Sequence, residues 1–464
     1  MKRLSSIFLA ALMAVNFACK KDKEDSIVTP SNDVTLEGTI NQSMTLDAGK
    51  KYILKGNVYV TAPAELTIPA GTVIMGDKVT KGALVIDRGA KIHATGTSGN
   101  PIIFTSGAPA GYKNYGDWGG IVILGKAPNN GGSNVNIEGI SAQAGESGKH
   151  GGTDADDNSG EFQYVRVEFA GIALSPDNEL NGLTFGSVGR STKVDHVQVS
   201  FSGDDAFEWF GGTVNAKYLV AYRTWDDDFD TDNGFSGNVQ YGIVVRDPSI
   251  ADISLSNGFE SDNNATGGPE VPLTAAQFSN ITVLGPYAFK VKSVASASKK
   301  IYNYTFGDIN GSYGQGAHLR RNTAQSIYNS VIIGFPTAVN FEKTNSGSKF
   351  SGNFLSRYKT LAAFSSGNGN DTTGFAANNR TLAGFNLADY FAGVVNQKID
   401  SSSNVANIFE LSNPNPLLKA GSPLLSGSKA VPAGLEQTSF VGAFDGSNNW
   451  MQGWTEFDPK NKAY

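Results

Sequence analysis

Residues 204–232 read DDAFEWFGGTVNAKYLVAYRTWDDDFDTD, and the spacing within this stretch decides the fold. It contains AFE at 206–208 and, 22 residues later, DFD at 228–230. A period of about 20–50 residues is typical of solenoids, and about 22 residues suffice for one coil of a parallel β-helix. The spacing therefore predicts two stacked coils, with Phe207 next to Phe229 and Glu208 next to Asp230.

The same pattern continues along the chain as GFE at 258–260, AFK at 288–290, GAH at 316–318 and AVN at 338–340. The longer steps are expected to be coils that carry an inserted loop. Because side chains alternate along a strand, the middle residue of each triplet is predicted to point inward. The predicted inward column is Phe207, Phe229, Phe259, Phe289, Ala317 and Val339. The predicted outward ladder is Glu208, Asp230, Glu260, Lys290, His318 and Asn340.

Short apolar runs outside these triplets support the same architecture. From residue 35 onward, runs of three to six β-prone residues, such as 83–86 and 121–124, are separated by Gly, Asn and Asp. Asn280, Asn303 and Asn329 each precede such a run, and Asn tolerates the left-handed backbone of a coil corner. The 55 Gly among 464 residues exceed the ~7% of ordinary proteins and argue against a helical bundle. We predict an all-β protein, a right-handed parallel β-helix solenoid with an irregular C-terminal cap.

The predicted organisation has four parts. Residues 1–18 are a signal peptide, 19–34 a lipidated flexible tether, 35–345 the parallel β-helix, and 346–464 the final coils, loops and cap. Trp450, Trp454 and Phe457 supply apolar mass near the end of the sequence. Because the open end of a solenoid exposes core and strand edges, we expect these side chains to cover it.

The N-terminal sequence predicts a membrane-anchored location. Residues 1–18 combine a positive start with a short apolar stretch, as a secretory signal does, and are too short to span a bilayer. Cys19, which follows Ala18, resembles the lipidated cysteine of a bacterial lipobox, with a plain secretory signal as the alternative. The charged run at 20–25 is similar to the surface-export signal of Bacteroidota lipoproteins. We expect a lipid-anchored protein of the outer membrane, at the cell surface.

Four motifs in order carry a family resemblance. They are GDWGGIVILG at 116–125, GEFQYVRVEFAG at 160–171, FEWFGGTVN at 207–215 and HLRR at 318–321. Together they resemble a family of β-helical outer-membrane lipoproteins of Bacteroidota and some proteobacteria, and more distantly the pectate-lyase-like β-helices. The resemblance implies fold and location, and leaves the biochemical function open.

Residues 204–232 are rich in carboxylates. Adjacent strands lie about 4.8 Å apart, where two unit charges repel by roughly 1 kcal/mol in water and 3 kcal/mol at an effective dielectric of 20. Such a cluster needs solvent, raised pKa values or a cation. Ca²⁺ suits an extracellular site built from oxygen ligands, and the single Cys excludes a cysteine-based metal site. The alternative is an exposed acidic face whose turns favour Asp. The candidate metal ligands are Asp204, Asp205, Glu208, Asp226, Asp227, Asp228, Asp230, Asp232 and Glu260.

Two aromatic residues flank the acids and are candidates for stacking on a sugar ring. Trp225 is expected at the surface, whereas Trp209 shares the strand parity of Phe207, which favours the core. If the face is catalytic, a base near the carboxylates could abstract a proton from a uronate, or paired acids could hydrolyse a glycoside. The catalytic candidates are Asp204, Asp205, Glu208, Asp230, Lys290 and His318.

Three functions remain open on the sequence. The first is a surface lipoprotein that binds an extracellular ligand, such as a glycan, over the acidic face with Ca²⁺ as its cofactor. The second is a polysaccharide lyase or glycoside hydrolase acting at the same face. The third is a non-catalytic accessory or structural partner of an outer-membrane transporter. A net charge of −6 argues against a nucleic-acid partner.

Overall fold

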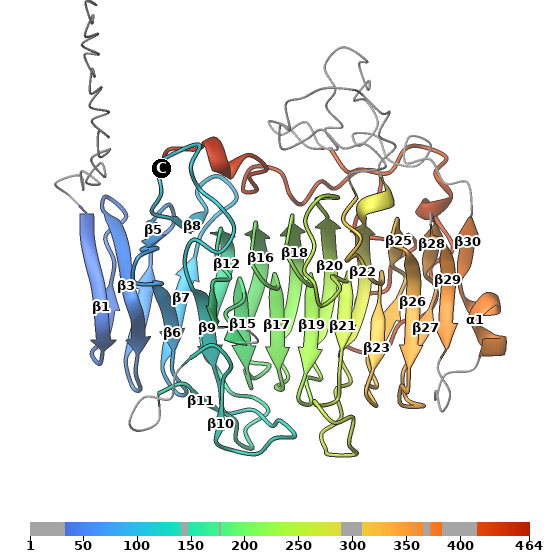
Figure 1. The fold of residues 1–464 in the computed structure, drawn as a ribbon, viewed down its shortest axis with the longest axis horizontal. Coiled ribbons are helices and arrows are strands. Elements are labelled where there is room, and N and C mark those ends of the chain that lie inside the picture. Colours follow the sequence, from blue (N-terminus) through green and yellow to red (C-terminus); the bar gives the residue numbers. More distant parts are fainter. Residues whose placement is uncertain are drawn as a thin grey trace, which may run out of the picture.

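The computed structural model describes residues 33–140, 147–175, 178–288, 309–356, 358–364, 372–382 and 415–464. Within them, 26 strands form one continuous sheet whose pairings are parallel, and the chain winds as a parallel β-helix from β1 at one end to β29 and α1 at the other (Figure 1). The predicted fold class is confirmed. The predicted signal peptide and Cys19 lie outside the described residues.

The sheet comprises three columns of strands. The first column contains β1(Asp33–Ile40), β3(Lys51–Val60), β5(Val73–Gly76), β8(Ile102–Ser106), β12(Gly160–Glu168), β16(Lys193–Ser200), β18(Asn215–Tyr222), β20(Asn238–Val245), β22(Gln277–Leu284), β25(Val331–Ile333), β28(Phe354–Ser356) and β30(Arg380–Leu382). The second contains β2(Met44–Thr45), β4(Glu65–Ile68), β7(Lys91–Thr95), the first halves of the long strands β12 to β22, β24(Ser326–Tyr328) and β27(Phe350–Ser351). The third contains the second half of β3, β6(Ala83–Ile86), β9(Gly120–Leu124), β15(Leu183–Gly186), β17(Phe207–Phe210), β19(Phe229–Asp232), β21(Phe259–Ser261), β23(His318–Arg320), β26(Thr337–Glu342) and β29(Thr360–Phe364).

The remaining described elements are short. Two antiparallel pairs of strands lie outside the continuous sheet of the β-helix. They are β10(Val135–Asn136) with β11(Lys149–His150) and β13(Ala173–Ser175) with β14(Asn178–Glu179). The helical elements are α1(Thr372–Asn378) and the 3₁₀ turns Pro286–Ala288, Pro423–Leu425 and Pro459–Asn461. Among the described residues, no helix has the length and apolar character that crossing a membrane requires.

The third column confirms most of the predicted register. Phe207 pairs with Phe229, and Phe229 with Phe259; all three are completely buried, and their rings contact one another at centroid distances of 5.7 and 5.5 Å. Ala317 and Val339 continue the buried column. The alternation of apolar and polar residues therefore builds the core that positions the outward acids.

The rung predicted at 288–290 is wrong. Glu260 of β21 pairs directly with His318 of β23, so no coil intervenes between them. Ala288 instead ends a 3₁₀ turn, and Phe289 and Lys290 lie outside the described residues. The spacing counted an inserted loop as a coil because the loop has nearly the length of one.

A corner between the second and first columns is formed by residues with left-handed backbone. Tyr164, His196, Tyr218 and Tyr241 occupy it on successive coils with φ of 49° to 62°, and their rings stack at 4.3, 4.4 and 5.1 Å. Asn280 and Asn329 continue this corner with φ of 57° and 46°, as predicted. Asn303 lies outside the described residues.

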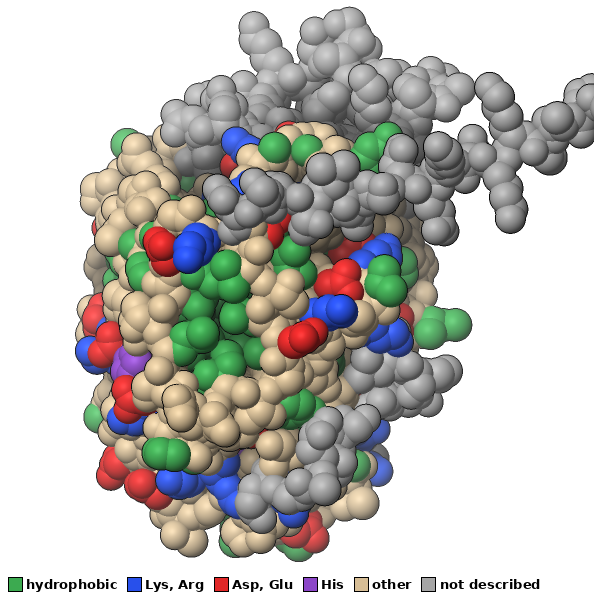
Figure 2. Space-filling view, turned by 90° about the vertical axis from the view of Figure 1, so that its left-hand side faces the viewer, with side chains coloured by type: hydrophobic (Ala, Val, Ile, Leu, Met, Phe, Trp, Pro, Cys, Tyr) green, Lys and Arg blue, Asp and Glu red, His purple; other side chains and the backbone are tan. Residues whose placement is uncertain are grey.

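Residues 415–464 form a strap that runs back along the side of the β-helix, shown in red in Figure 1. Trp450 and Trp454 are buried there, with their rings edge-on to His196 at 6.4 and 5.5 Å. They cover the stacked corner rather than the open end, which differs from the cap we expected. Figure 2 views the end formed by β1, where hydrophobic side chains gather at the centre of the exposed face.

Candidate functional site

The outward ladder of the third column forms a row of carboxylates. Glu208 pairs in register with Asp230, and Asp230 with Glu260, on β17, β19 and β21. The neighbouring inward phenylalanines fix the direction of these acids, because adjacent strand residues point to opposite faces. The juxtaposition of Glu208 and Asp230 is therefore as predicted. Glu208 is only 8% exposed, so this row is more buried than an ordinary acidic surface.

A second row of side chains lies at the entrance to the same strands. The Asp205 carboxylate accepts a hydrogen bond from the backbone N–H of Asp227 at 2.7 Å, and the Asp227 carboxylate accepts one from the backbone N–H of Asn257. The amides of Asn181 and Asn257 accept equivalent bonds from Asp205 N–H and Gln315 N–H. Asp and Asn thus do the same structural task on successive coils, and only Asp205 and Asp227 add a charge to it.

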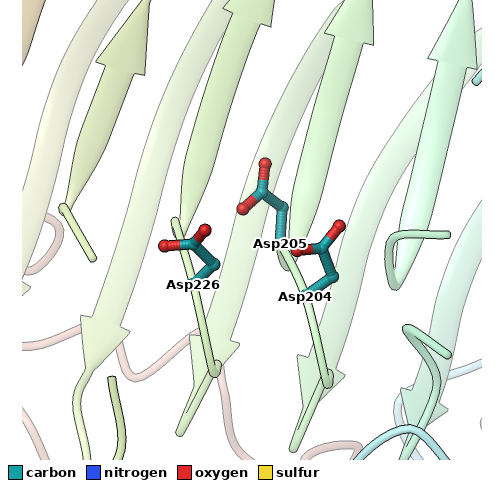
Figure 3. Close-up of side chains that lie close together, drawn as sticks. All are labelled: Asp204, Asp205 and Asp226. Atoms are coloured by element: carbon teal, nitrogen blue, oxygen red, sulfur yellow. The ribbon is translucent and has the colours of Figure 1, made fainter. Parts of the chain in front are cut away.

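The two rows bring carboxylate oxygens of neighbouring coils close together. Three groups each have oxygens within 4.8 Å of one another, and they overlap through Asp205 and Asp230. Figure 3 shows the first group, with Asp204 and Asp205 on one coil and Asp226 on the next. The groups are Asp204, Asp205 and Asp226; Asp205, Glu208 and Asp230; and Asp227, Asp230 and Glu260. We call these seven residues the carboxylate column.

Burial and mutual repulsion make ionisation of the column costly. Burial is the main cause, and neighbouring carboxylates add to it, so that the pKa values of five of its members lie well above the usual range. These five are Asp204, Asp205, Glu208, Asp227 and Asp230. Burial also raises the pKa of Asp226 to about 6 and that of the nearby Asp232 to about 7.

Among the described residues, basic side chains pair with the carboxylate column only at Glu260. Arg320 pairs with Glu260 and, at 2.8 Å, with Asp262, and Arg321 pairs with Asp262 at 2.6 Å. His318 lies 3.0 Å from Glu342 and 3.6 Å from Glu260. Toward Glu208 the amide of Asn181 donates a hydrogen bond, which supplies no positive charge.

Acids on the second column of strands, unlike those in the middle of the carboxylate column, have basic partners. Glu65 pairs with Lys91 at 3.6 Å, and Glu161 with Lys193 at 2.7 Å. Each of these carboxylates has a lysine on the next coil. The Asp205, Glu208 and Asp230 group has other carboxylates there instead, in an arrangement that could hold a metal ion.

Two predicted ligands, Asp228 and Asp232, belong to none of the three groups. Asp228 pairs with Arg246 at 3.1 Å, and neither side chain is exposed. The Asp232 carboxylate accepts the backbone N–H of Asn233 at 2.6 Å. The catalytic candidate Lys290 lies outside the described residues.

The two tryptophans have different environments. Trp209 is completely buried and stacks between Phe185 and Phe235, at 5.7 and 5.3 Å. It is a core residue, as its strand parity favoured, and is not available to stack on a sugar ring. Trp225 lines an open cavity of about 540 Å³ beside Asp204 and Asp226 of the carboxylate column, together with Tyr115. Trp225 is half-buried, with part of its side chain at the surface.

Sequence reasoning missed Asn181 and Asn257, although a signal was present. Each lies two residues before an inward strand residue, Leu183 or Phe259, exactly as Asp205 precedes Phe207. Reading Asp and Asn as equivalent at that position would have extended the row. The cavity residues Asp252 and Ser254 gave no such signal, because they lie in a loop of irregular length.

Comparison with known proteins supports the architecture. Residues 38–400 match the family described as the pectate-lyase like beta helix domain, which is well over half of the chain. The curated proteins include no match to this chain.

Proposed function

We propose, from the premise that the chain belongs to the pectate-lyase-like β-helix family, that it holds Ca²⁺ in the carboxylate column and binds an extracellular glycan over it. The observation that carries this proposal is the pair of carboxylate groups that share Asp230, each with oxygens within 4.8 Å of one another. A divalent cation between coils would replace the repulsion within each group by attraction.

The donor set fits Ca²⁺. Ca²⁺ takes 6–8 oxygen ligands at roughly 2.3–2.6 Å, including carboxylates that bind through one or both oxygens. The group of Asp205, Glu208 and Asp230 supplies such oxygens, and each of its acids comes from a rigid strand or strand entrance. Bound Ca²⁺ would supply positive charge to which glycan hydroxyls or carboxylates coordinate.

The proposed location is the outer face of an outer membrane. Cys19 after Ala18, together with the charged run at 20–25, supports a lipid anchor followed by a tether. An anchor of this kind would place the β-helix where extracellular Ca²⁺ and polysaccharides are available. In this setting the partners would be the membrane, a polysaccharide and, in an uptake complex, a transporter, with no role for nucleic acid.

The second candidate function is a polysaccharide lyase or glycoside hydrolase at the same face. It is favoured by His318, whose imidazole contacts Glu260 at the end of the column. A neutral imidazole next to a cation could take the proton that a lyase removes from a uronate. Unsaturated uronate absorbs in the ultraviolet, so incubation with acidic polysaccharides tests this reaction; no absorbance change across the panel would count against it.

Calcium titration tests the leading proposal. We expect isothermal titration of the protein to show Ca²⁺ binding, and EDTA to lower its melting temperature. The variant Glu208→Gln/Asp230→Asn should lose both effects, because it removes two ligands of the central group. The control Glu65→Gln/Glu161→Gln removes two lysine-paired acids and should keep both effects. Equal Ca²⁺ binding by the two variants would refute the assignment.

A further inference from the structure

The cavity beside Asp204 and Asp226 is lined by aromatic side chains as well as by carboxylates. Its lining includes the aromatic side chains Tyr115 and Trp225, which meet edge-to-face at a centroid distance of 5.5 Å. Tyr115 also packs against Phe201 at 5.4 Å, so this wall is anchored in the core. The volume of about 540 Å³ falls within the roughly 300–1,000 Å³ of small-ligand sites.

Three glycines form part of the lining and let neighbouring coils approach closely at this wall of the cavity. Gly116, Gly171 and Gly203 come from neighbouring coils, and Gly116 and Gly171 have left-handed backbone, with φ of 60° and 83°. A Cβ at Gly203 would lie 2.5 Å from the carbonyl oxygen of Gly171. The glycines therefore form a wall of closely packed backbone, and no side chain from these three positions projects into the cavity.

The ionisable side chains of the lining, Tyr115 apart, are all carboxylates among the described residues. Asp226 and Asp252 are linked through the Ser254 hydroxyl, which lies 2.8 and 2.7 Å from their Oδ2 atoms. The Oδ1 atom of Asp226 is buried and has no hydrogen-bond partner among the described residues. No hydrogen bond or ion pair of the described residues engages the Asp204 carboxylate, which lies beside Asp226 (Figure 3). Glu179 completes the acidic lining.

This combination favours an organic cation over a metal ion. Aromatic faces attract ammonium groups and stack on apolar C–H faces, and they offer nothing to Ca²⁺. Carboxylates accept charge-assisted hydrogen bonds from an amine, which are stronger than bonds to neutral donors. An apolar ring face that carries a charged amine matches both parts of the lining.

We propose that this cavity binds an amine-bearing sugar, a hexosamine unit of a glycan, with its ring against Trp225 and its ammonium between Asp204 and Asp226. The inference deepens the proposed function and rests on glycan binding at this face. It is independent of Ca²⁺ in the deeper part of the column, because the groups centred on Glu208 and Glu260 do not include Asp204 or Asp226.

Isothermal titration with matched oligosaccharides tests the inference. The probes are a glucosamine trimer with free amines and its N-acetylated counterpart, at neutral pH with EDTA present. We expect the free-amine trimer to bind at least about tenfold more tightly, since one charge-assisted hydrogen bond contributes roughly that factor. Equal affinity for the two trimers would overturn the proposal.

Variants locate the binding. Asp204→Asn and Trp225→Ala should each weaken binding of the free-amine trimer about tenfold, whereas Glu37→Gln, which removes an exposed charge from β1, should leave it unchanged. Retained melting temperatures would show that the variants fold. The amino-sugar assignment is wrong if all three variants bind the free-amine trimer like the parent. It is also wrong if spermidine binds as tightly as the trimer and its affinity is unchanged by Trp225→Ala.

The result of the oligosaccharide test can be told apart from the result of the calcium test of the proposed function. If the protein binds Ca²⁺ but binds only N-acetylated or acidic oligosaccharides, the amino-sugar assignment is wrong and the calcium site is still supported. Binding of the free-amine trimer without Ca²⁺ uptake would remove the metal from the column and support the cavity.

Discussion

At the scale of single residues, the column uses Asp where neighbouring coils use Asn. Asn181, Asp205, Asp227 and Asn257 accept backbone N–H groups of the next coil in the same way. An amide oxygen suffices for that bond. The negative charges of Asp205 and Asp227 are therefore additional to what the fold requires, which supports a role in binding a cation.

Substitutions at Asp227 should separate the structural role from the charge. In EDTA, Asp227→Asn should keep the bond from Asn257 N–H and remove a buried repulsive charge, so it should be neutral or stabilising. Asp227→Ala leaves a buried N–H unsatisfied and should lower the free energy of unfolding by about 1–3 kcal/mol. Urea denaturation measures both; equal destabilisation by Asn and Ala would contradict this division of roles.

The sequence predicted residue roles only where periodicity constrained them. The positions of Glu208, Asp230 and Glu260 followed from strand alternation and the 22-residue step. The pairing of Asp228 with Arg246 could not be foreseen, because it depends on the shape of a turn rather than on the repeat.

At the scale of elements, the strap is held by side-chain amides that mimic backbone pairing. Gln240 donates to the carbonyl of Glu436 and accepts from its N–H, both at 2.8 Å. Gln198 does the same with Glu456, and Asn329 with Lys429. The partners lie 100 to 258 residues apart with no repeating pattern, which is why the sequence did not predict the strap's course.

Removing one of these amides should loosen the strap. Gln240→Ala deletes the two hydrogen bonds with Glu436 and a third to Asn280, and it should lower the free energy of unfolding by about 1–3 kcal/mol. Hydrogen exchange should then speed up at residues near Glu436. Gln452→Ala, at an exposed position of the strap, is the control and should change neither quantity. Unaltered exchange in Gln240→Ala would show that these amides do not hold the strap.

The register of elements was predictable where one coil follows directly on another and failed at insertions. The steps from β17 to β19 and to β21 were right, whereas the segment 288–290 was mistaken for a rung. Spacing alone cannot distinguish a coil from a loop of nearly equal length.

At the scale of the whole molecule, the β-helix converts a short repeat into a linear array of charge. The core side chains fix the direction of each strand, and the stacking of coils places acids from residues 204 to 260 in one column. The β1 end, with its central hydrophobic side chains (Figure 2), lies well away from this column in the order of coils.

The stability of the metal-free protein should fall as pH rises. The pKa values of Asp226 and Asp232 are raised to about 6 and about 7, so the folded state holds protons that the unfolded state has released above pH ~4. The contribution of these two carboxyls to stability is therefore greatest near pH ~4 and declines toward pH ~7, by more than about 1 kcal/mol. Burial lowers the pKa of His150 to about 4, which opposes part of this decline. Melting curves in EDTA should show this decline, and Ca²⁺ should reduce it. A melting temperature in EDTA that rises over this range would contradict the burial of these carboxyls.

A crystal structure of the protein grown with Ca²⁺ tests the central claim most directly. We predict an ion bound by oxygens from at least two neighbouring coils, at roughly 2.3–2.6 Å, with Glu208 or Glu260 and Asp230 among its ligands. Well-ordered carboxylates in this column with only water between them, at saturating Ca²⁺, would contradict the account.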